Sequence, residues 1–330
     1  MTADHSISQD KEGQALLSIV IPLFNEAGNL TKLYDELITV LPAIKLPWEI
    51  IFSDDGSQDS SWEEIELLHA KDHRVKGLRL SRNFGHQYAL LAGLSCSRGD
   101  AVVSMDADLQ HPPEMVPKLV AEWQNGNKIV HTNRLDPENI SFAKKITSKL
   151  YYKVFSFLSG VKIGSGMADF RLLDRQVLNN VLCFQEEGLF FRGVVQWVGH
   201  KNTTLDYACR ERFAGASKYT LGKMIKLART GITSFSTVPL RIGIFIGIIT
   251  SLLAFGEMVY AIAVKIFTDT ATPGWASAVS IVSFLFGILF ILLGIVGEYV
   301  GSILIEVRRR PRFLITEQVG IQNKIQDYRF

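Results

Sequence analysis

The sequence Ala101-Val-Val-Ser-Met-Asp-Ala-Asp-Leu-Gln110 begins as a short apolar strand and ends in two aspartates that are one residue apart. We expect Asp106 and Asp108 to point the same way, because the strand turns where it ends. Carboxylates held this close repel each other unless a cation lies between them, and oxygen ligands of this kind suit Mg²⁺ or Mn²⁺. A metal held there can bridge a diphosphate and offset the charge that develops as the diphosphate leaves. The stretch therefore predicts a divalent metal site.

Three similar apolar runs precede this one, and each run is followed by a segment of helical character. The predicted strands are Leu17–Pro22, Glu49–Ser53, Val75–Leu80 and Ala101–Met105. The predicted helices are Leu30–Leu41, Ser60–Ala70, Gly85–Cys96 and Pro113–Glu122. Strands that alternate with helices indicate an α/β fold with a largely parallel sheet and helices on both of its faces.

Polar or acidic residues follow all four predicted strands. They are Pro22-Leu-Phe-Asn25-Glu26, Asp54-Asp55-Gly56-Ser57, Ser81-Arg82-Asn83 and Asp106-Ala-Asp108-Leu-Gln110. Ligands of such sheets bind beyond the carboxyl ends of the strands, so these residues predict one acidic site. The usual dinucleotide and P-loop sites are excluded, because no GxGxxG follows the first strand and no GxxxxGK[ST] occurs in the chain.

Two long apolar segments lie near the C-terminus. Ile242–Val264 contains only one charged residue, Glu257, and Ala276–Gly297 contains none. Both are long enough to cross a bilayer, and buried core helices are rarely apolar on every side. We predict a transmembrane hairpin over 238–306. Glu257 is costly in lipid, so we expect either an interhelical hydrogen bond or a substrate contact for it.

Basic residues flank this hairpin and indicate its orientation. They are Lys223, Lys226, Arg229 and Arg241 before it, and Arg308, Arg309, Arg310 and Arg312 after it. The loop between the spans holds only Lys265 and Asp269. The positive-inside bias predicts a multi-pass protein with the soluble part and both termini in the cytoplasm. The N-terminus lacks the pattern of a signal peptide, which agrees with this orientation.

Glycines with GxxxG spacing occur in both spans, at Gly243/Gly247 and Gly297/Gly301, and such spacing lets helices approach closely. We therefore expect a homo-oligomer. The net charge of +2 argues against a nucleic-acid partner, which would favour a clear basic excess. The three cysteines are far apart and show no metal-binding spacing, which is typical of a reducing compartment.

The motifs together resemble glycosyltransferase family 2, which has the GT-A fold. The resemblance is carried by Leu17–Glu26, by Asp54-Asp-Gly-Ser57 and by Asp106-Ala-Asp-Leu-Gln-His-Pro-Pro-Glu114. Further matching segments are Ser81-Arg-Asn-Phe-Gly-His86, Asp169-Phe-Arg-Leu172 and Arg212-Phe-Ala-Gly-Ala-Ser-Lys-Tyr219. The chain is most similar to the polyprenyl-phosphate branch, which contains dolichol-phosphate mannose synthases and bactoprenol glucosyltransferases. The segment Gly164-Ser-Gly-Met-Ala168 departs from the family pattern.

The resemblance implies inverting transfer of a hexose to a polyprenyl phosphate at the cytoplasmic face of the inner membrane. UDP-glucose is the favoured donor. Pro22, Asn25, Glu26 and Asp54 are expected to hold the nucleoside, with Asp55 in the same turn. Asp106 and Asp108 are expected to hold the metal and the diphosphate, and Gln110 adds a metal or phosphate contact.

The family also implies an acceptor side of the site. Arg134, just past a predicted strand over Lys128–Thr132, matches an arginine that meets the acceptor phosphate. Asp169 and Arg171 match residues beside that phosphate, and Arg212 and Lys218 lie in a loop that closes over the donor. Such cations offset the repulsion between two phosphate groups in one cleft. The alternative for each of the four basic residues is an ion pair with a nearby acid, and for His86 a contact at a helix start.

A phosphate oxyanion is already a nucleophile at pH 7, so a general base is not required, and Asp169 is the one candidate. Basic amphipathic stretches over 142–158 and 221–232 predict helices at the membrane interface or, alternatively, helices packed on the sheet. We expect a disordered tail over 1–14, a catalytic domain over 15–220, an interface helix over 221–237 and a basic tail over 307–330.

Two other functions compete with this interpretation. A processive polysaccharide synthase usually has a QxxRW motif and more spans, whereas this chain has Gln196-Trp-Val-Gly-His200 and two spans. A catalytically silent scaffold that only binds nucleotide-sugar would carry a degraded acidic site, and this one is intact.

Overall fold

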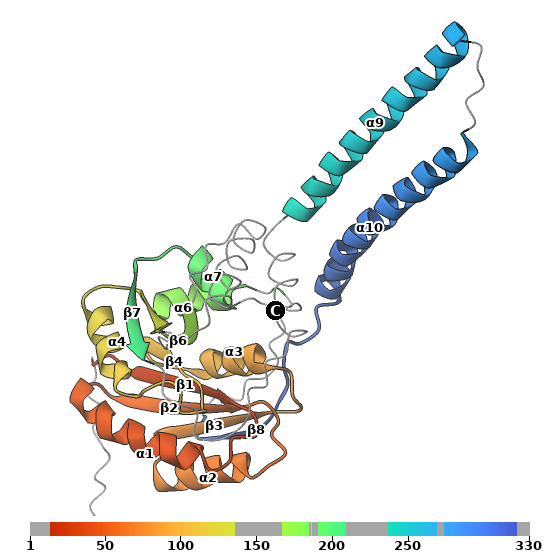
Figure 1. Ribbon diagram of the computed structural model, residues 1–330. Coiled ribbons are helices and arrows are strands. Elements are labelled where there is room, and N and C mark those ends of the chain that lie inside the picture. The colour runs from red at the N-terminus through yellow and green to blue at the C-terminus, as the bar shows by residue number, and fades with distance from the viewer. Residues whose placement is uncertain are drawn as a thin grey trace, which may run out of the picture. The chain divides into compact units, whose positions relative to one another are not determined.

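The fold of the soluble part is an eight-stranded sheet with helices on both faces (Figure 1). It is known from a computed structural model that describes residues 14–135, 167–184, 186, 191–208, 237–268 and 274–321. The strand order is β7-β5-β6-β4-β1-β2-β3-β8. The strands are β1 (Leu17–Leu23), β2 (Trp48–Asp54), β3 (Val75–Leu80), β4 (Ala101–Ser104), β5 (Ile129–Leu135), β6 (Met167–Asp174), β7 (Asn202–Ala208) and β8 (Ile315–Val319).

The four strands predicted from sequence form the centre of the sheet and share one direction. β1 pairs in parallel with β2 and β4, and β2 pairs in parallel with β3. Every residue of β1 and β2 is buried, as expected for parallel strands covered on both faces. The carboxyl ends of these strands therefore lie at one edge of the sheet, as predicted. β5 has this direction too, because β5 and β4 are both antiparallel to β6.

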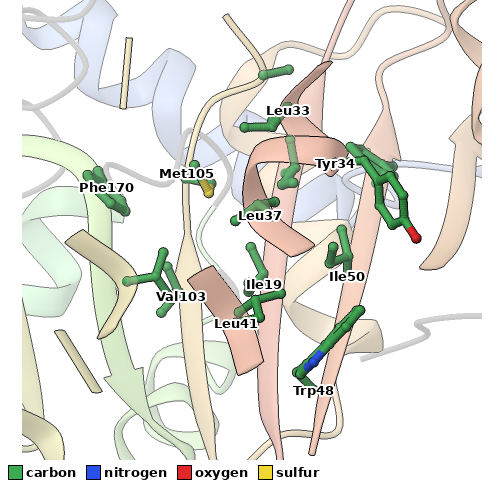
Figure 2. Close-up of a cluster of buried hydrophobic side chains, with 14 of the residues drawn as sticks. Ile19, Leu33, Tyr34, Leu37, Leu41, Trp48, Ile50, Val103, Met105 and Phe170 are labelled. Carbon is green, nitrogen blue, oxygen red and sulfur yellow. The ribbon is translucent and has the colours of Figure 1, made fainter. Parts of the chain in front are cut away.

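The helices of the sheet domain pack on its two faces. They are α1 (Leu30–Val40), α2 (Ser61–Lys71), α3 (His86–Cys96), α4 (Met115–Gln124), α6 (Arg175–Leu182) and α7 (Phe191–Trp197), with a 3-10 turn, η1 (Leu41–Ile44), after α1. Figure 1 shows α1 and α2 on one face of β1–β3 and α3 on the other. On the α1 face, leucines of α1 meet isoleucines of β1 and β2 (Figure 2). On the opposite face α3 lies so close to β1 that a Cβ on Gly93 would stand 2.5 Å from Val20 Cγ1.

The last described segment returns to the sheet as an edge strand, which corrects one prediction. We expected a basic tail over 307–330, but Ile315–Val319 form β8, which is antiparallel to β3. The run Ile315-Thr-Glu-Gln-Val319 is polar at its centre, so it lacks the apolar pattern by which the central strands were predicted. The domain limits proposed from the sequence otherwise stay predictions.

Two long apolar helices form a separate compact unit. They are α9 (Val238–Thr268) and α10 (Trp275–Arg308), and they contain the two predicted spans. Only 6% and 0% of their most apolar stretches are buried within the chain, so they are not core helices of the soluble part. At a rise of 1.5 Å per residue each is longer than the roughly 30 Å apolar core of a bilayer. Both are candidate membrane spans, and Glu257 is exposed on α9.

Candidate active site

The loop after β1 is joined by hydrogen bonds to the turn after β2. Asn25 has a left-handed backbone (φ 54°), and its N–H donates to Ser57 Oγ at 2.9 Å. Its side-chain oxygen accepts from the Gln58 N–H at 2.9 Å. Glu26, also predicted to bind the nucleoside, donates its N–H to Ser61 Oγ at 3.0 Å. The two segments predicted to hold the nucleoside thus form one connected surface.

Two acids, Asp59 in the turn before α2 and Glu64 on α2, fix the rest of the β1 loop. Asp59 Oδ2 accepts from the Ala27 N–H at 3.1 Å, and Glu64 accepts from the N–H groups of Gly28 and Thr31 at 2.8 and 2.7 Å. The loop is therefore held before any ligand arrives. Pro22 is buried in β1, one residue before the strand ends.

The aspartate pair after β2 is buried and engaged by the protein. Asp54 Oδ1 accepts from the N–H and the hydroxyl of Ser57, and Asp55 accepts from the N–H groups of Phe84 and Gly85 at 2.8 and 2.9 Å. The Asp54 and Asp55 residues are 0% and 2% exposed. Burial raises the pKa of both carboxyls, although the hydrogen bonds oppose this shift. Their predicted contact with the nucleoside stays a prediction.

A glycine lets these two loops approach. Gly56 has φ 71°, and a Cβ there would stand 2.7 Å from the backbone carbon of Arg82 in the loop between β3 and α3. Any side chain at this position would push that loop away from the turn. The Asp-Asp-Gly-Ser order therefore has a steric cause as well as a polar one.

Asp106, at the end of β4, lies between two imidazoles. His86 Nε2 is 3.6 Å from its Oδ1, and His111 Nε2 is 3.7 Å from its Oδ2. His111 Nδ1 accepts from the Asp106 N–H at 2.9 Å, so a neutral His111 ring carries its proton on Nε2 and faces the carboxylate. His111 is buried and stacks on Phe170, with ring centroids 4.9 Å apart. Sequence reasoning missed this residue, although it directly follows the Asp-Ala-Asp-Leu-Gln run.

The turn that follows Asp106 contains the other two predicted metal residues, Asp108 and Gln110. Asp108 Oδ1 accepts from the Gln110 N–H at 3.2 Å, and Leu109 between them has a left-handed backbone with φ 61°. This conformation is uncommon for leucine, so the turn is held in place by its surroundings. Asp106 keeps about a third of its side chain exposed (34%), unlike the pair after β2.

The side-chain oxygens of this turn suit a divalent metal that also binds a ligand. Within the described residues no group of three or more His, Cys, Asp or Glu side chains could hold a metal by itself. Asp106, Asp108 and Gln110 instead offer a few oxygen atoms, and hard cations such as Mg²⁺ complete such sets with substrate phosphate oxygens. The three predicted metal residues lie in one turn after β4, and their role as metal ligands stays a prediction.

A second cluster surrounds Asp169 on β6. Arg192 donates to both of its oxygens at 2.9 Å, Arg171 Nη2 donates to Oδ1 at 3.2 Å and Gln87 Nε2 to Oδ2 at 3.3 Å. His86 Nε2, which faces Asp106, is also 3.8 Å from Asp169 Oδ2. The two predicted sides of the site therefore meet at His86. Arg192 was missed, because its partner is distant in the sequence.

This environment does not favour Asp169 as a general base. Burial alone would raise its pKa, but Arg192 and Arg171 together hold the pKa of Asp169 well below its usual range. Such a carboxylate is a weak base. Arg171 is 1% exposed, and burial lowers its pKa to about 10. Arg171 contacts Asp169 and lies over the Phe191 ring, and its predicted contact with the acceptor stays a prediction.

The remaining predicted residues divide into two groups. Arg134 is exposed at the end of β5, whose carboxyl end lies at the same sheet edge as that of β4. Arg212, Lys218 and the amphipathic stretches over 142–158 and 221–232 lie outside the described residues.

Comparison with known families decides the class of this site. The family model described as glycosyl transferase family 2 matches residues 18–182, which contain β2 to β6, all of β1 but its first residue, and both acidic clusters. This chain belongs to glycosyltransferase family 2. The predicted family and its GT-A fold are thereby confirmed.

Relatives of similar length support the assignment. A glycosyltransferase of Bacillus subtilis (strain 168), YkcC, is 39% identical over 93% of this chain and 95% of its own. The bactoprenol glucosyl transferase of Shigella phage SfX is 37% identical over 91% of this chain and 98% of its own. Among solved structures, mannosyl-3-phosphoglycerate synthase from Rubrobacter xylanophilus matches with a TM-score of 0.46 at 18% identity, over 66% of this chain and 71% of its own.

Proposed function

We propose that this family 2 glycosyltransferase transfers glucose from UDP-glucose to a polyprenyl phosphate at the cytoplasmic face of the inner membrane. The observation that carries the proposal is the partly exposed Asp106 carboxylate beside Asp108, at the end of β4. The names of the relatives called bactoprenol glucosyl transferase support the sugar and the lipid class. The two apolar, unburied helices support a membrane location.

In this proposal the donor lies across the carboxyl edge of the sheet. Its nucleoside rests against the connected surface of Asn25, Glu26 and the Asp54–Ser57 turn. Asp106, Asp108 and Gln110 hold a divalent metal, which when bound offsets the charge of the departing diphosphate. His111 orients Asp106 by accepting its backbone N–H and facing its carboxylate.

The acceptor phosphate lies on the β5–β6 side of the site, where Arg134 meets it. An oxygen of the lipid phosphate attacks the anomeric carbon, the bond from this carbon to the diphosphate breaks, and the nucleoside diphosphate leaves. One displacement of this kind inverts the anomeric configuration. No side chain has to remove a proton from an ionised phosphate, which agrees with the low basicity of Asp169. From the family resemblance alone we also propose that Arg212 and Lys218 contact the donor.

Transfer of radiolabel to lipid tests the proposal. The purified protein is mixed with undecaprenyl phosphate, Mn²⁺ or Mg²⁺, and a panel of labelled UDP- and GDP-sugars. We expect label from UDP-glucose to enter the organic phase, and EDTA to prevent this. Label in a long water-soluble polymer would instead favour a processive synthase, and nucleotide binding without transfer of any sugar would favour a scaffold.

A further inference from the structure

The edge strand β8 is built from residues that follow both apolar helices in the chain. Its register with β3 places Glu317 opposite Arg79, and Leu314 O accepts from the Ser81 N–H at 2.8 Å. Thr316 Oγ1 donates to Arg79 O at 3.2 Å. The strand therefore lies along the part of β3 that leads to the carboxyl edge of the sheet.

The Arg79 side chain extends this pairing into the β2 turn. Its Nη1 lies 3.0 Å from Glu317 Oε1, its Nη2 donates to Ser57 O at 2.9 Å, and its Nε lies 3.5 Å from Asp54 Oδ2. Its side chain is 26% exposed, whereas that of Asp54 is completely buried. One guanidinium thus holds a strand from the end of the chain and the turn predicted to support the nucleoside.

The contacts continue from this turn to the β1 loop. Asp54 Oδ1 accepts from the Ser57 hydroxyl, and Ser57 Oγ accepts from the Asn25 N–H. Asp54 Oδ2 is buried and has no hydrogen bond within the described part of the chain. The charge of Arg79 is what compensates this oxygen, and an uncompensated buried carboxylate is costly. Losing Arg79 would therefore alter the turn and, through Ser57, the position of Asn25.

We propose that Arg79 is a positioning residue for the donor nucleotide and that β8, through Glu317, is a working part of the donor site. The inference rests on the proposed function, which locates the nucleoside at Asn25 and the Asp54–Ser57 turn. It assigns to the segment after α10 a role in donor affinity. Arg79 itself does not touch the reacting atoms in this account.

The test compares variants of the two partners in the full-length protein. Arg79→Gln removes the charge, Arg79→Lys keeps it with fewer donors, and Glu317→Gln weakens the β8 partner alone. Arg74→Lys is a matched control, because Arg74 precedes β3 at the opposite sheet edge and pairs with Asp72. Glu66→Gln on α2 is the control for loss of an exposed carboxylate. UDP affinity is measured by calorimetry with Mn²⁺, together with KM for UDP-glucose and kcat.

We expect Arg79→Gln to raise the UDP Kd and the donor KM about tenfold, as loss of a charged hydrogen bond does. Glu317→Gln should raise both about threefold, as for a partly exposed ion pair, and Arg79→Lys should fall between them. kcat at saturating donor should stay near the wild-type value, and the controls should not change. In the Arg79→Gln background, Glu317→Gln should have no further effect, because its partner is gone.

Two outcomes separate the possible failures. If the wild type binds UDP and transfers sugar, but Glu317→Gln matches Glu66→Gln in Kd and KM, the inference is wrong while the proposed function stands. If the wild type neither binds UDP nor transfers sugar, the proposed function is wrong and the inference falls with it. A folding defect in Arg79→Gln leaves Glu317→Gln to decide, since Glu317 is 47% exposed.

Discussion

The two acidic pairs at the carboxyl edge of the sheet look alike in sequence but differ in their surroundings. After β2, Asp54 and Asp55 are buried, and backbone N–H groups bind one oxygen of the first and both oxygens of the second. After β4, the Asp106 carboxylate is about a third exposed (34%) and faces two imidazoles at 3.6 and 3.7 Å. A carboxylate whose oxygens accept hydrogen bonds from the protein holds its turn in place. A solvent-accessible carboxylate can instead bind a cation and the ligand of that cation. From this contrast we propose a structural role for Asp54 and Asp55 and a metal-binding role for Asp106 and Asp108.

The largest expected effect is on the chemical pair. Asp108→Asn should lower sugar transfer about a thousandfold, as loss of one electrostatic contact to a developing charge can do. Folding and membrane insertion should be unchanged, because Asp108 is only partly buried. The check is the radiolabel assay, with thermal melting as the control for folding. Wild-type turnover in this variant would remove the metal assignment.

Arg192→Ala should have the next largest effect, on stability. The change leaves the Asp169 carboxylate, whose side chain is 7% exposed, without its bidentate partner. Breaking such a buried pair costs about 3 kcal/mol. The melting temperature should fall by about 10 °C at the few degrees per kcal/mol typical of domains this size. A melting temperature equal to that of the wild type would show that Arg171 alone suffices.

Asp55→Ala should destabilise the β2 turn to a smaller extent. The change leaves the Phe84 and Gly85 N–H groups without their acceptor. If water reaches one of them, the free energy of unfolding should fall by about 1–2 kcal/mol in total. Asp106→Ala is the matched variant at the other pair and should leave the melting temperature unchanged. Equal melting temperatures of the two variants would contradict the proposed difference between the two aspartate pairs.

The smallest expected effect concerns pH and involves neither pair. His131 is buried on β5, and burial and Arg171 lower its pKa to about 4 from 6.5. Between these values the unfolded chain binds the proton more tightly, so stability is full above pH 6.5 and is lost as the pH falls. From pH 7.5 to 5.5 the loss is about 1 kcal/mol. His131→Leu should reduce the pH dependence of melting by this amount, and an unchanged slope would contradict the assignment.

Local patterns predicted the centre of the fold well. The limits of β1 to β4 agree with the expected strands within one residue, because buried parallel strands are short Val- and Ile-rich runs bounded by turns. β8 escaped detection, because its partner β3 lies more than two hundred residues away in the chain. No local pattern carries such a pairing.

The sequence predicted where the site residues lie in the fold, but not which of them the protein buries and which stay accessible. The strand ends located Asp54, Asp55, Asp106 and Asp108 correctly at one edge. Which carboxylate stays accessible depends on N–H groups from the loop before α3, and these could not be placed from sequence. His111 and Arg192 were missed for the same reason, since their partners become visible only in the fold.

The most direct test of the contrast is UDP binding in Mn²⁺ and in EDTA, measured by calorimetry for three proteins. For the wild type we expect EDTA to weaken binding at least about tenfold, because in the proposed function Asp106 and Asp108 would hold a divalent metal that offsets the charge of the diphosphate. Asp108→Asn should bind UDP weakly and equally under both conditions, while Asp55→Asn should keep the dependence on Mn²⁺. Metal-dependent binding that persists in Asp108→Asn, or that disappears in Asp55→Asn, would contradict the assignment of chemistry to the pair after β4.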